Sequence, residues 1–178
     1  MKNLFEDWKE KIPKYDRQFK ALLFDQLTKT GGGTEKARED RGKPFSNNYE
    51  LYIYSFFLGL YKELFQPIPE ENSRIDFSMP IKTWGNKTNV QLRKDFTNLQ
   101  EYMFIALLAK VDLDLIALEK GALIKEEAVK LLIKTMEAYT NGGLLLLAEK
   151  IEENPDYFFR PMSFLNMIIE KEIYEDLR

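Results

Sequence analysis

The sequence predicts an all-α protein, a compact multi-helix bundle of about six to eight helices with a long irregular loop around residues 66–89. Apolar residues recur at helical spacing through most of the 178 residues. Prolines and glycines gather at a few breaks between these segments. The composition, 44% hydrophobic and 31% charged, is typical of a globular protein with a buried core. We therefore expect a single helical domain over residues 1–178.

The first thirty residues are expected to form a pair of helices. Apolar side chains are spaced for one helix face at Leu4, Phe5, Trp8 and Ile12. A second helix is expected from Pro13, a residue that suits a first helical turn. The glycines of 31–33 then end it, because residues without Cβ lose too much backbone entropy in a helix. We expect this pair, residues 1–30, to be joined to the body through a flexible Gly-rich segment, 31–46.

A central helix is expected from Asn47 onwards. Asn47 and Glu50 have the spacing of a capping box, and apolar or aromatic residues then cover almost every side up to Phe65. Gly59 inside this helix is explained by a close helix crossing. Core packing is the favoured explanation of the aromatic residues, while a homodimer interface would suit them as well. Base stacking on these aromatic rings is the weaker alternative.

The remaining elements follow a long break. Residues 66–89 are rich in Pro, Gly and Asn, with a short extended piece expected at 74–79. Helices are expected from Val90, over 113–120 with Gly121 as the stop, and from Lys125. The helix faces are marked by Phe96, Leu99, Met103, Leu107 and Leu108, and then by Leu131, Leu132 and Met136.

The pair Asn141 and Gly142 predicts a tight left-handed turn that ends the helix from Lys125. A new helix would begin at Leu144, and the outer face of that helix is acidic. Because a DNA-recognition helix presents basic residues outwards, we expect a packing corner here rather than a DNA reader.

The sequence contains no Cys and no His, which excludes disulfides, thiolate nucleophiles, Cys/His zinc sites and imidazole catalysis. The glycines do not form a nucleotide-binding P-loop, because no Gly precedes Lys36 and Ala37 follows it. The acidic groups are interpreted as solvated helix faces: Asp112 with Asp114, Glu126 with Glu127, and Glu152, Glu153 and Asp156. We expect no catalytic residues, no metal and no cofactor.

No apolar segment approaches the roughly 20 residues that a membrane-spanning helix needs, and no signal peptide pattern precedes the first helix. The sequence therefore predicts a cytoplasmic protein without membrane contact.

Two basic segments are candidate contacts for a partner or for nucleic acid. The first follows the glycines, and the second lies in a window without acids, residues 77–94, around an aromatic residue. Cations beside an exposed aromatic ring suit phosphate contact with base stacking. The candidate residues are Lys36, Arg38, Arg41, Lys43, Lys82, Trp84, Lys87, Arg93 and Lys94. A solvated loop is the alternative interpretation of the second segment.

Several pieces in order resemble a known family. They are "RGKPF", "YIYSFFLGLY", "QPIP", "YMFIALLAK", "EAYTNGGLLLLAEKI" and "FLNMIIE", of which the "NGG" after "EAY" is the most specific. The layout, over residues 38–170, is similar to that of small accessory proteins of bacterial Dnd systems, which modify DNA with phosphorothioates and restrict unmodified DNA. The helices before Gly31 and the connection 66–89 depart from the family, whose members place these pieces closer together. The resemblance implies a setting in DNA modification or phage defence, without catalytic residues to carry over.

These observations lead to two main hypotheses. The first is a non-enzymatic accessory or adaptor protein that acts through protein–protein contacts. The alternative is a nucleic-acid-binding protein that uses basic segments 36–43 and 82–94. A Mg²⁺-dependent phosphodiesterase built on carboxylates is a third and distant hypothesis.

Overall fold

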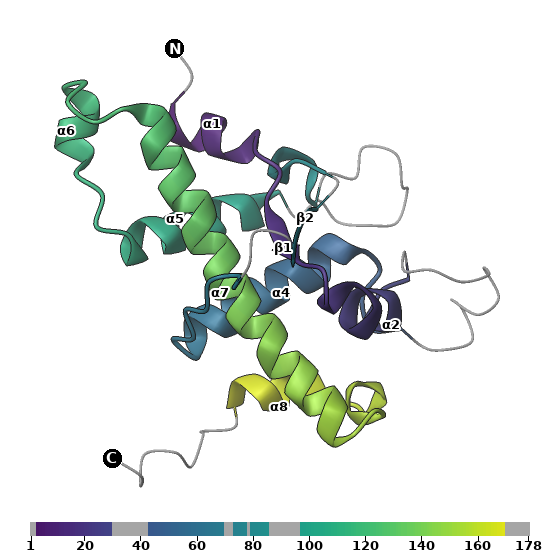
Figure 1. The fold of residues 1–178 in the computed structure, drawn as a ribbon. Coiled ribbons are helices and arrows are strands. Elements are labelled where there is room, and N and C mark those ends of the chain that lie inside the picture. The colour runs from purple at the N-terminus through teal and green to yellow at the C-terminus, as the bar shows by residue number, and fades with distance from the viewer. Residues whose placement is uncertain (1–2, 30–42, 70–72, 78, 86–96, 170–178) are drawn as a thin grey trace, which may run out of the picture. The chain divides into compact units, whose positions relative to one another are not determined.

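The computed structural model describes residues 3–29, 43–69, 73–77, 79–85 and 97–169. The described chain is mostly helical, as the sequence predicts (Figure 1). It divides into two compact units, each built from segments distant in sequence. Unit 1 comprises Met1–Arg17 and Phe65–Tyr139, and unit 2 comprises Gln18–Leu64 and Thr140–Arg178. None of the described helices has the length and hydropathy to span a membrane.

Unit 1 combines helices with one small sheet. Its described elements are α1 (Leu4–Lys9), β1 (Lys14–Asp16), β2 (Arg74–Asp76), the 3₁₀ helix η3 (Ile81–Thr83), α5 (Asn98–Lys110), α6 (Leu115–Glu119) and the first part of α7 (Lys125–Glu153). Phe5 and Trp8 of α1 pack with Phe104 of α5, with ring centroids 5.2 to 6.0 Å apart. Trp8 is fully buried, so this aromatic cluster holds α1 against α5.

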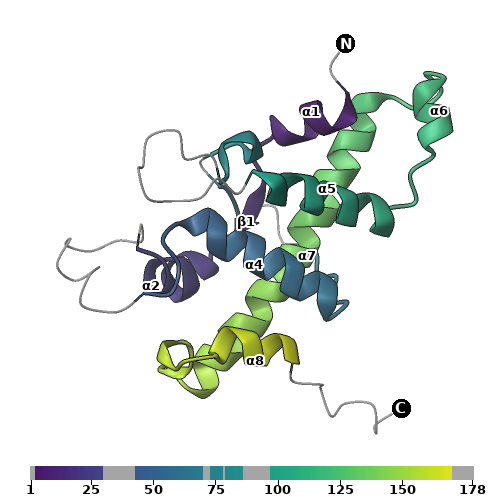
Figure 2. The same ribbon diagram turned by 180° about the vertical axis from the view of Figure 1, so that it is seen from behind.

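Unit 2 takes the rest of α7. Its other described elements are the π-helical turn η1 (Lys20–Phe24), α2 (Asp25–Leu27), α4 (Asn48–Tyr61), the 3₁₀ helix η4 (Tyr157–Phe159) and α8 (Ser163–Ile169). Within this unit α4 and α8 lie side by side (Figure 2). The hydroxyl of Tyr54 in α4 donates to the carbonyl of Phe164 in α8 at 2.6 Å, and burial raises the pKa of this phenol. The hydrogen bond and the packed rings of Phe45, Tyr54 and Phe164 hold α8 in place.

The chain after Pro13 first forms a strand, so the predicted start of the second helix at that residue is wrong, while its later part is helical in η1 and α2. β1 and β2 pair antiparallel, with Tyr15 opposite Ile75. The pairing extends at one end, where the Phe77 amide donates to the Pro13 carbonyl at 2.9 Å. The backbone groups that a helix would satisfy locally are therefore satisfied by a segment about 60 residues away in sequence. The extended piece expected at 74–79 is confirmed over Arg74–Asp76.

The start of α4 is confirmed, with a modified cap. Asn47 is the N-cap residue, but its side chain donates to the Glu50 carboxylate at 3.3 Å instead of accepting from the helix. The other Glu50 oxygen accepts from the Ser46 amide at 2.7 Å. Glu50 thus makes one of the two hydrogen bonds of a capping box, the one in which the carboxylate accepts from a backbone amide before the helix.

Asn141, Gly142 and Gly143 lie inside α7, so the predicted turn at "NGG" is wrong. A Cβ on Gly143 would clash with the carbonyl oxygen of Ser55 in α4. The same Cβ would lie 2.7 Å from the carbonyl carbon and 2.9 Å from the Cα of Ser55. A Cβ on Gly142 would clash with the Leu64 carbonyl. All four residues belong to unit 2. The glycines therefore serve a close approach of main chains, which a side chain would prevent.

The two sides of the segment 30–42 are held together. The Lys29 amide donates to the Phe45 carbonyl at 2.9 Å, and the Phe45 amide donates to the Leu27 carbonyl at 3.1 Å. Both sides belong to unit 2, whereas residues 3–17 belong to unit 1. The described residues on both sides of 30–42 therefore bond to each other within one unit. The glycines themselves lie outside the described residues, so their role as a flexible joint stays a prediction.

Glu137 links α7 to β1 inside unit 1. Its carboxylate accepts a hydrogen bond from the Lys14 amide at 2.7 Å, and the residue is 8% exposed. Burial raises the pKa of Glu137, while the Lys14 amide and the charges of Arg74, Lys14 and Lys134 act in the opposite direction. At neutral pH the ionised carboxylate therefore costs stability.

The Gly143→Ala substitution is expected to destabilise the protein by about 2–3 kcal/mol, since the added methyl group meets main-chain atoms that cannot rotate away. An uncrowded helical glycine behaves oppositely, because replacement by Ala then stabilises by roughly 1 kcal/mol. The test is therefore whether the substitution lowers or raises the denaturant concentration at the midpoint of unfolding. A more stable Gly143→Ala variant would contradict the close contact.

The Glu137→Gln substitution is expected to stabilise the protein at neutral pH, because the amide oxygen keeps the Lys14 hydrogen bond without a buried charge. The raised pKa means that the folded protein binds the proton more tightly, so wild-type stability falls as pH rises from about 4.5 through the folded pKa. Melting temperatures between pH 4 and 8 should show the advantage of the variant growing with pH. Exposed Glu127→Gln is the control for loss of one negative charge, and an equal gain there would refute the explanation.

Candidate partner-binding surface

Three of the nine predicted contact residues lie within the described part of the chain: Lys43, Lys82 and Trp84. The other six are outside it, and their role stays a prediction: Lys36, Arg38, Arg41, Lys87, Arg93 and Lys94. Lys43 belongs to unit 2, while Lys82 and Trp84 belong to unit 1.

Trp84 is a core residue, which corrects the expectation of an exposed aromatic ring. The residue is 1% exposed, and its ring packs edge-to-face on Phe77 with centroids 5.2 Å apart. Its indole N–H donates to the Met79 carbonyl at 3.2 Å. Its own carbonyl accepts from the side chain of Gln100 in α5 at 2.7 Å. A ring enclosed in this way has no open face on which a base could stack.

Lys43 is also buried, so its prediction as a surface contact is wrong. Only 5% of the residue is exposed, and its ammonium group donates to the carbonyls of Asp25 and Thr28 at 2.7 and 3.0 Å. Thr28 is the C-cap of α2, and the dipole of a helix favours a cation at this end. The hydrogen bonds of the buried Lys43 ammonium thus stabilise unit 2.

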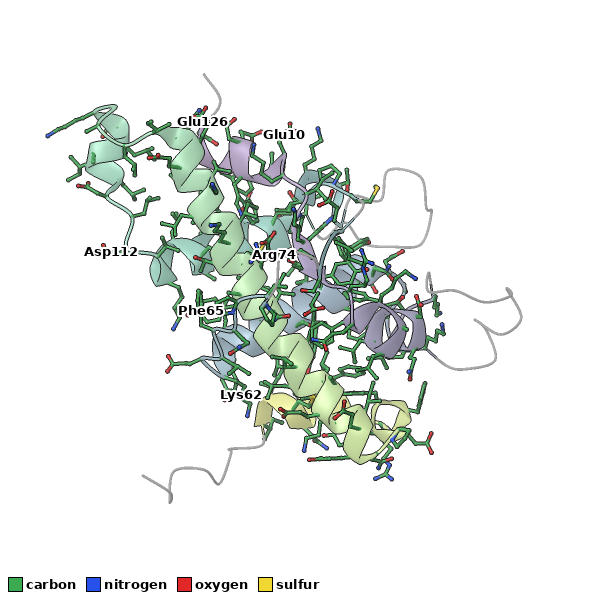
Figure 3. The ribbon with its side chains drawn as sticks, viewed as in Figure 1. Glu10, Lys62, Phe65, Arg74, Asp112 and Glu126 are labelled. Carbon is green, nitrogen blue, oxygen red and sulfur yellow. The ribbon has the colours of Figure 1, made fainter. Side chains whose placement is uncertain are left out.

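Lys82 remains on the surface, but it pairs with an acid. Its ammonium lies 2.6 Å from the carboxylate of Glu10, which follows α1 and is labelled in Figure 3. The pairing of opposite charges reduces the positive potential that a phosphate backbone would require.

Two of the acidic residues singled out in the sequence, Asp114 and Glu153, have structural partners. Asp114 is the N-cap of α6, and its side chain accepts from the Ala117 amide at 2.8 Å. Glu153 pairs with Lys150 at 3.3 Å. Among the described residues, no three potential acidic metal ligands gather at one point.

A different surface stands out, the connection between α5 and α7. In the twenty residues from Leu108 to Glu127, which we call the α6 lobe, no residue is buried. Leu115, Ile116 and Ile124 are 51%, 64% and 57% exposed. The lobe carries eight larger aliphatic residues: Leu108, Val111, Leu113, Leu115, Ile116, Leu118, Leu123 and Ile124. In Figures 1 and 2, α6 stands apart from the other helices of unit 1. Sequence reasoning found the helix but missed its exposure, because its apolar pattern resembles that of a core helix.

Local interactions define both ends of α6. Asp114 caps its N-terminus, and Gly121 adopts a φ of 72° after its C-terminus. The Ala122 amide donates to the Ala117 carbonyl at 2.8 Å, and the Gly121 amide donates to the Leu118 carbonyl at 3.2 Å, which is the Schellman arrangement. The predicted stop at Gly121 is therefore confirmed. Local hydrogen bonds hold the helix, so its apolar side chains remain available for contact.

Other exposed apolar residues of unit 1 lie on α5 and α7. Tyr102 and Ile105, three residues apart on α5, are exposed and share a helix face. Leu131 of α7, expected in the core beside Leu132 and Met136, is also exposed, whereas the other two are buried. The lobe itself contains five acidic residues and three lysines.

Comparison with protein-family models gave no match, and no curated protein and no solved structure matches the chain. The resemblance to Dnd accessory proteins therefore stays a prediction. Its most specific piece, the "NGG" after "EAY", lies within α7 rather than in a turn.

Proposed function

We propose that this protein is a non-enzymatic adaptor that binds a partner protein through the α6 lobe. The observation that carries the proposal is the continuous stretch of twenty residues, rich in Leu and Ile, in which no side chain is buried. Single exposed apolar residues are ordinary on protein surfaces, but contiguous apolar patches are typical of interaction sites. The absence of His and Cys from the whole sequence also favours binding over catalysis.

The charges of the lobe favour a partner of particular chemistry. Acidic residues outnumber lysines, and Lys125 at the start of α7 is paired with Asp7 of α1. A complementary surface would offer an apolar groove for Leu115 and Ile116 with basic residues at its rim. The helix is short and capped, so little conformational entropy would be lost on docking.

The predicted family resemblance provides the first partners to test. Its layout is that of accessory proteins in bacterial DNA phosphorothioate systems, so we propose a protein component of such a system as the partner. A basic rim would be expected on a protein that also contacts DNA.

The double substitution Leu115→Ser and Ile116→Ser is expected to weaken partner binding about 30-fold, since exposed anchors of this kind carry most of the binding energy. Stability should change by less than about 0.5 kcal/mol, because neither side chain is buried. The partner is identified by a photo-crosslinking residue at position 116 in bacterial cells, and its affinity is then measured with both purified proteins by titration calorimetry.

The control is the same crosslinker at Tyr61, an equally exposed residue of unit 2. The same proteins crosslinked from both positions, or an affinity unchanged by the double substitution, would refute the proposal. Crosslinking only to a second copy of the chain would refute it in favour of a homodimer.

A further inference from the structure

Four lysines surround a hollow of about 310 Å³ in unit 1. Lys11 and Lys14 come from the segment between α1 and β1 and from β1 itself, while Lys130 and Lys134 come from α7. Lys130 and Lys134 are both exposed and four residues apart, so they lie on one helix face. Like charges at this spacing repel each other, and Glu126, four residues before Lys130, offsets part of this repulsion.

The acids at this hollow do not balance the lysines. Glu126 and Glu137 are the two acidic residues that line it. Glu137 is buried, and its carboxylate accepts the Lys14 amide at 2.7 Å. Four cations against two acids leave the hollow electropositive.

Part of the lining of the hollow is apolar. Ile12, Val129 and Ile133 line it together with the lysines. Inorganic anions gain nothing from such a surface, whereas a ligand with an organic part buries apolar area against it. The volume is at the lower end of the range for small-molecule sites, which suits a ligand the size of a mononucleotide.

We propose that this hollow binds an organic phosphate, with the phosphoryl oxygens held by the lysines and the organic part lying on Ile12, Val129 and Ile133. A phosphoryl group fits better than a carboxylate because it carries up to two negative charges and three terminal oxygens for several ammonium donors. The ligand is a free nucleotide or a nucleotide unit of nucleic acid, which share this chemistry.

A second hollow, of about 300 Å³, shares Lys134 and Glu137 with the first. Its lining includes Arg74 of β2 and the aromatic ring of Phe65, both labelled in Figure 3. Arg74 also raises the positive potential around Glu137. Glu137 therefore lines both hollows, and its negative charge lowers their affinity for anions.

Titration calorimetry with adenosine monophosphate tests the proposal. The double variant Lys130→Ala and Lys134→Ala is expected to bind at least about tenfold more weakly, since charge-assisted hydrogen bonds are lost. Glu137→Gln should bind on the order of fivefold more tightly, because it removes a negative charge next to the lysines. The matched control is Lys110→Ala and Lys120→Ala, which removes two exposed lysines of unit 1 outside the hollow and should leave affinity unchanged.

Two further probes separate the sources of the phosphate. A short single-stranded DNA that binds more tightly than adenosine monophosphate, with the same dependence on Lys130 and Lys134, assigns the site to nucleic acid, and the reverse order assigns it to a free nucleotide. Orthophosphate that binds as well as the nucleotide would overturn the organic part of the proposal. Failure of all three probes to bind at 10 mM (on the order of the weakest relevant affinity), or an equal loss in the control variant, would overturn it entirely. Melting curves of each variant confirm that it is folded.

Discussion

The contact of Gly142 and Gly143 with the main chain of Ser55 and Leu64 is the constraint on which unit 2 depends. The buried residues of α4 and of the second part of α7 can share a core only if the two backbones come this close. A helix normally loses stability at glycine, so two in succession are costly unless the close packing offsets them. Here the continuity of α7 through both glycines shows that tertiary contact outweighs local propensity.

Local signals predicted the elements that depend on local hydrogen bonds. The start of α4 and the stop at Gly121 were both visible in the sequence, whereas the cap at Asp114 that starts α6 was missed. β1 was not visible in the sequence, because three residues paired with a distant segment leave no periodicity to detect, although an extended piece was expected at its partner β2. The "NGG" of α7 has the residue types that usually end a helix. Trp84 stands among basic residues in the sequence, although a hydrogen bond from Gln100 fixes it in the core. In each of these cases the deciding partner lies elsewhere in the chain.

The two proposed sites lie on the same part of unit 1. The α6 lobe ends at Glu127, and two of the four lysines of the hollow, Lys130 and Lys134, follow on the next turns of α7. From Ile124 to Lys130 the rise along a helix is about 9 Å. A partner on the lobe and an anion in the hollow would therefore contact neighbouring turns at the start of one helix. Their charges differ, since the lobe is acidic and the hollow basic, so each surface selects against the ligand of the other.

The hydrogen bonds of Phe45 with Lys29 and Leu27 have a consequence for engineering. They fix the distance between the two sides of residues 30–42 whatever lies between them. The entropy of closing such a connection grows only with the logarithm of its length, so a doubling costs about 0.6 kcal/mol. An insertion between the two sides should therefore cost little stability. A fluorescent label or an affinity tag could be inserted here, because the hydrogen bonds of unit 2 hold the two sides together.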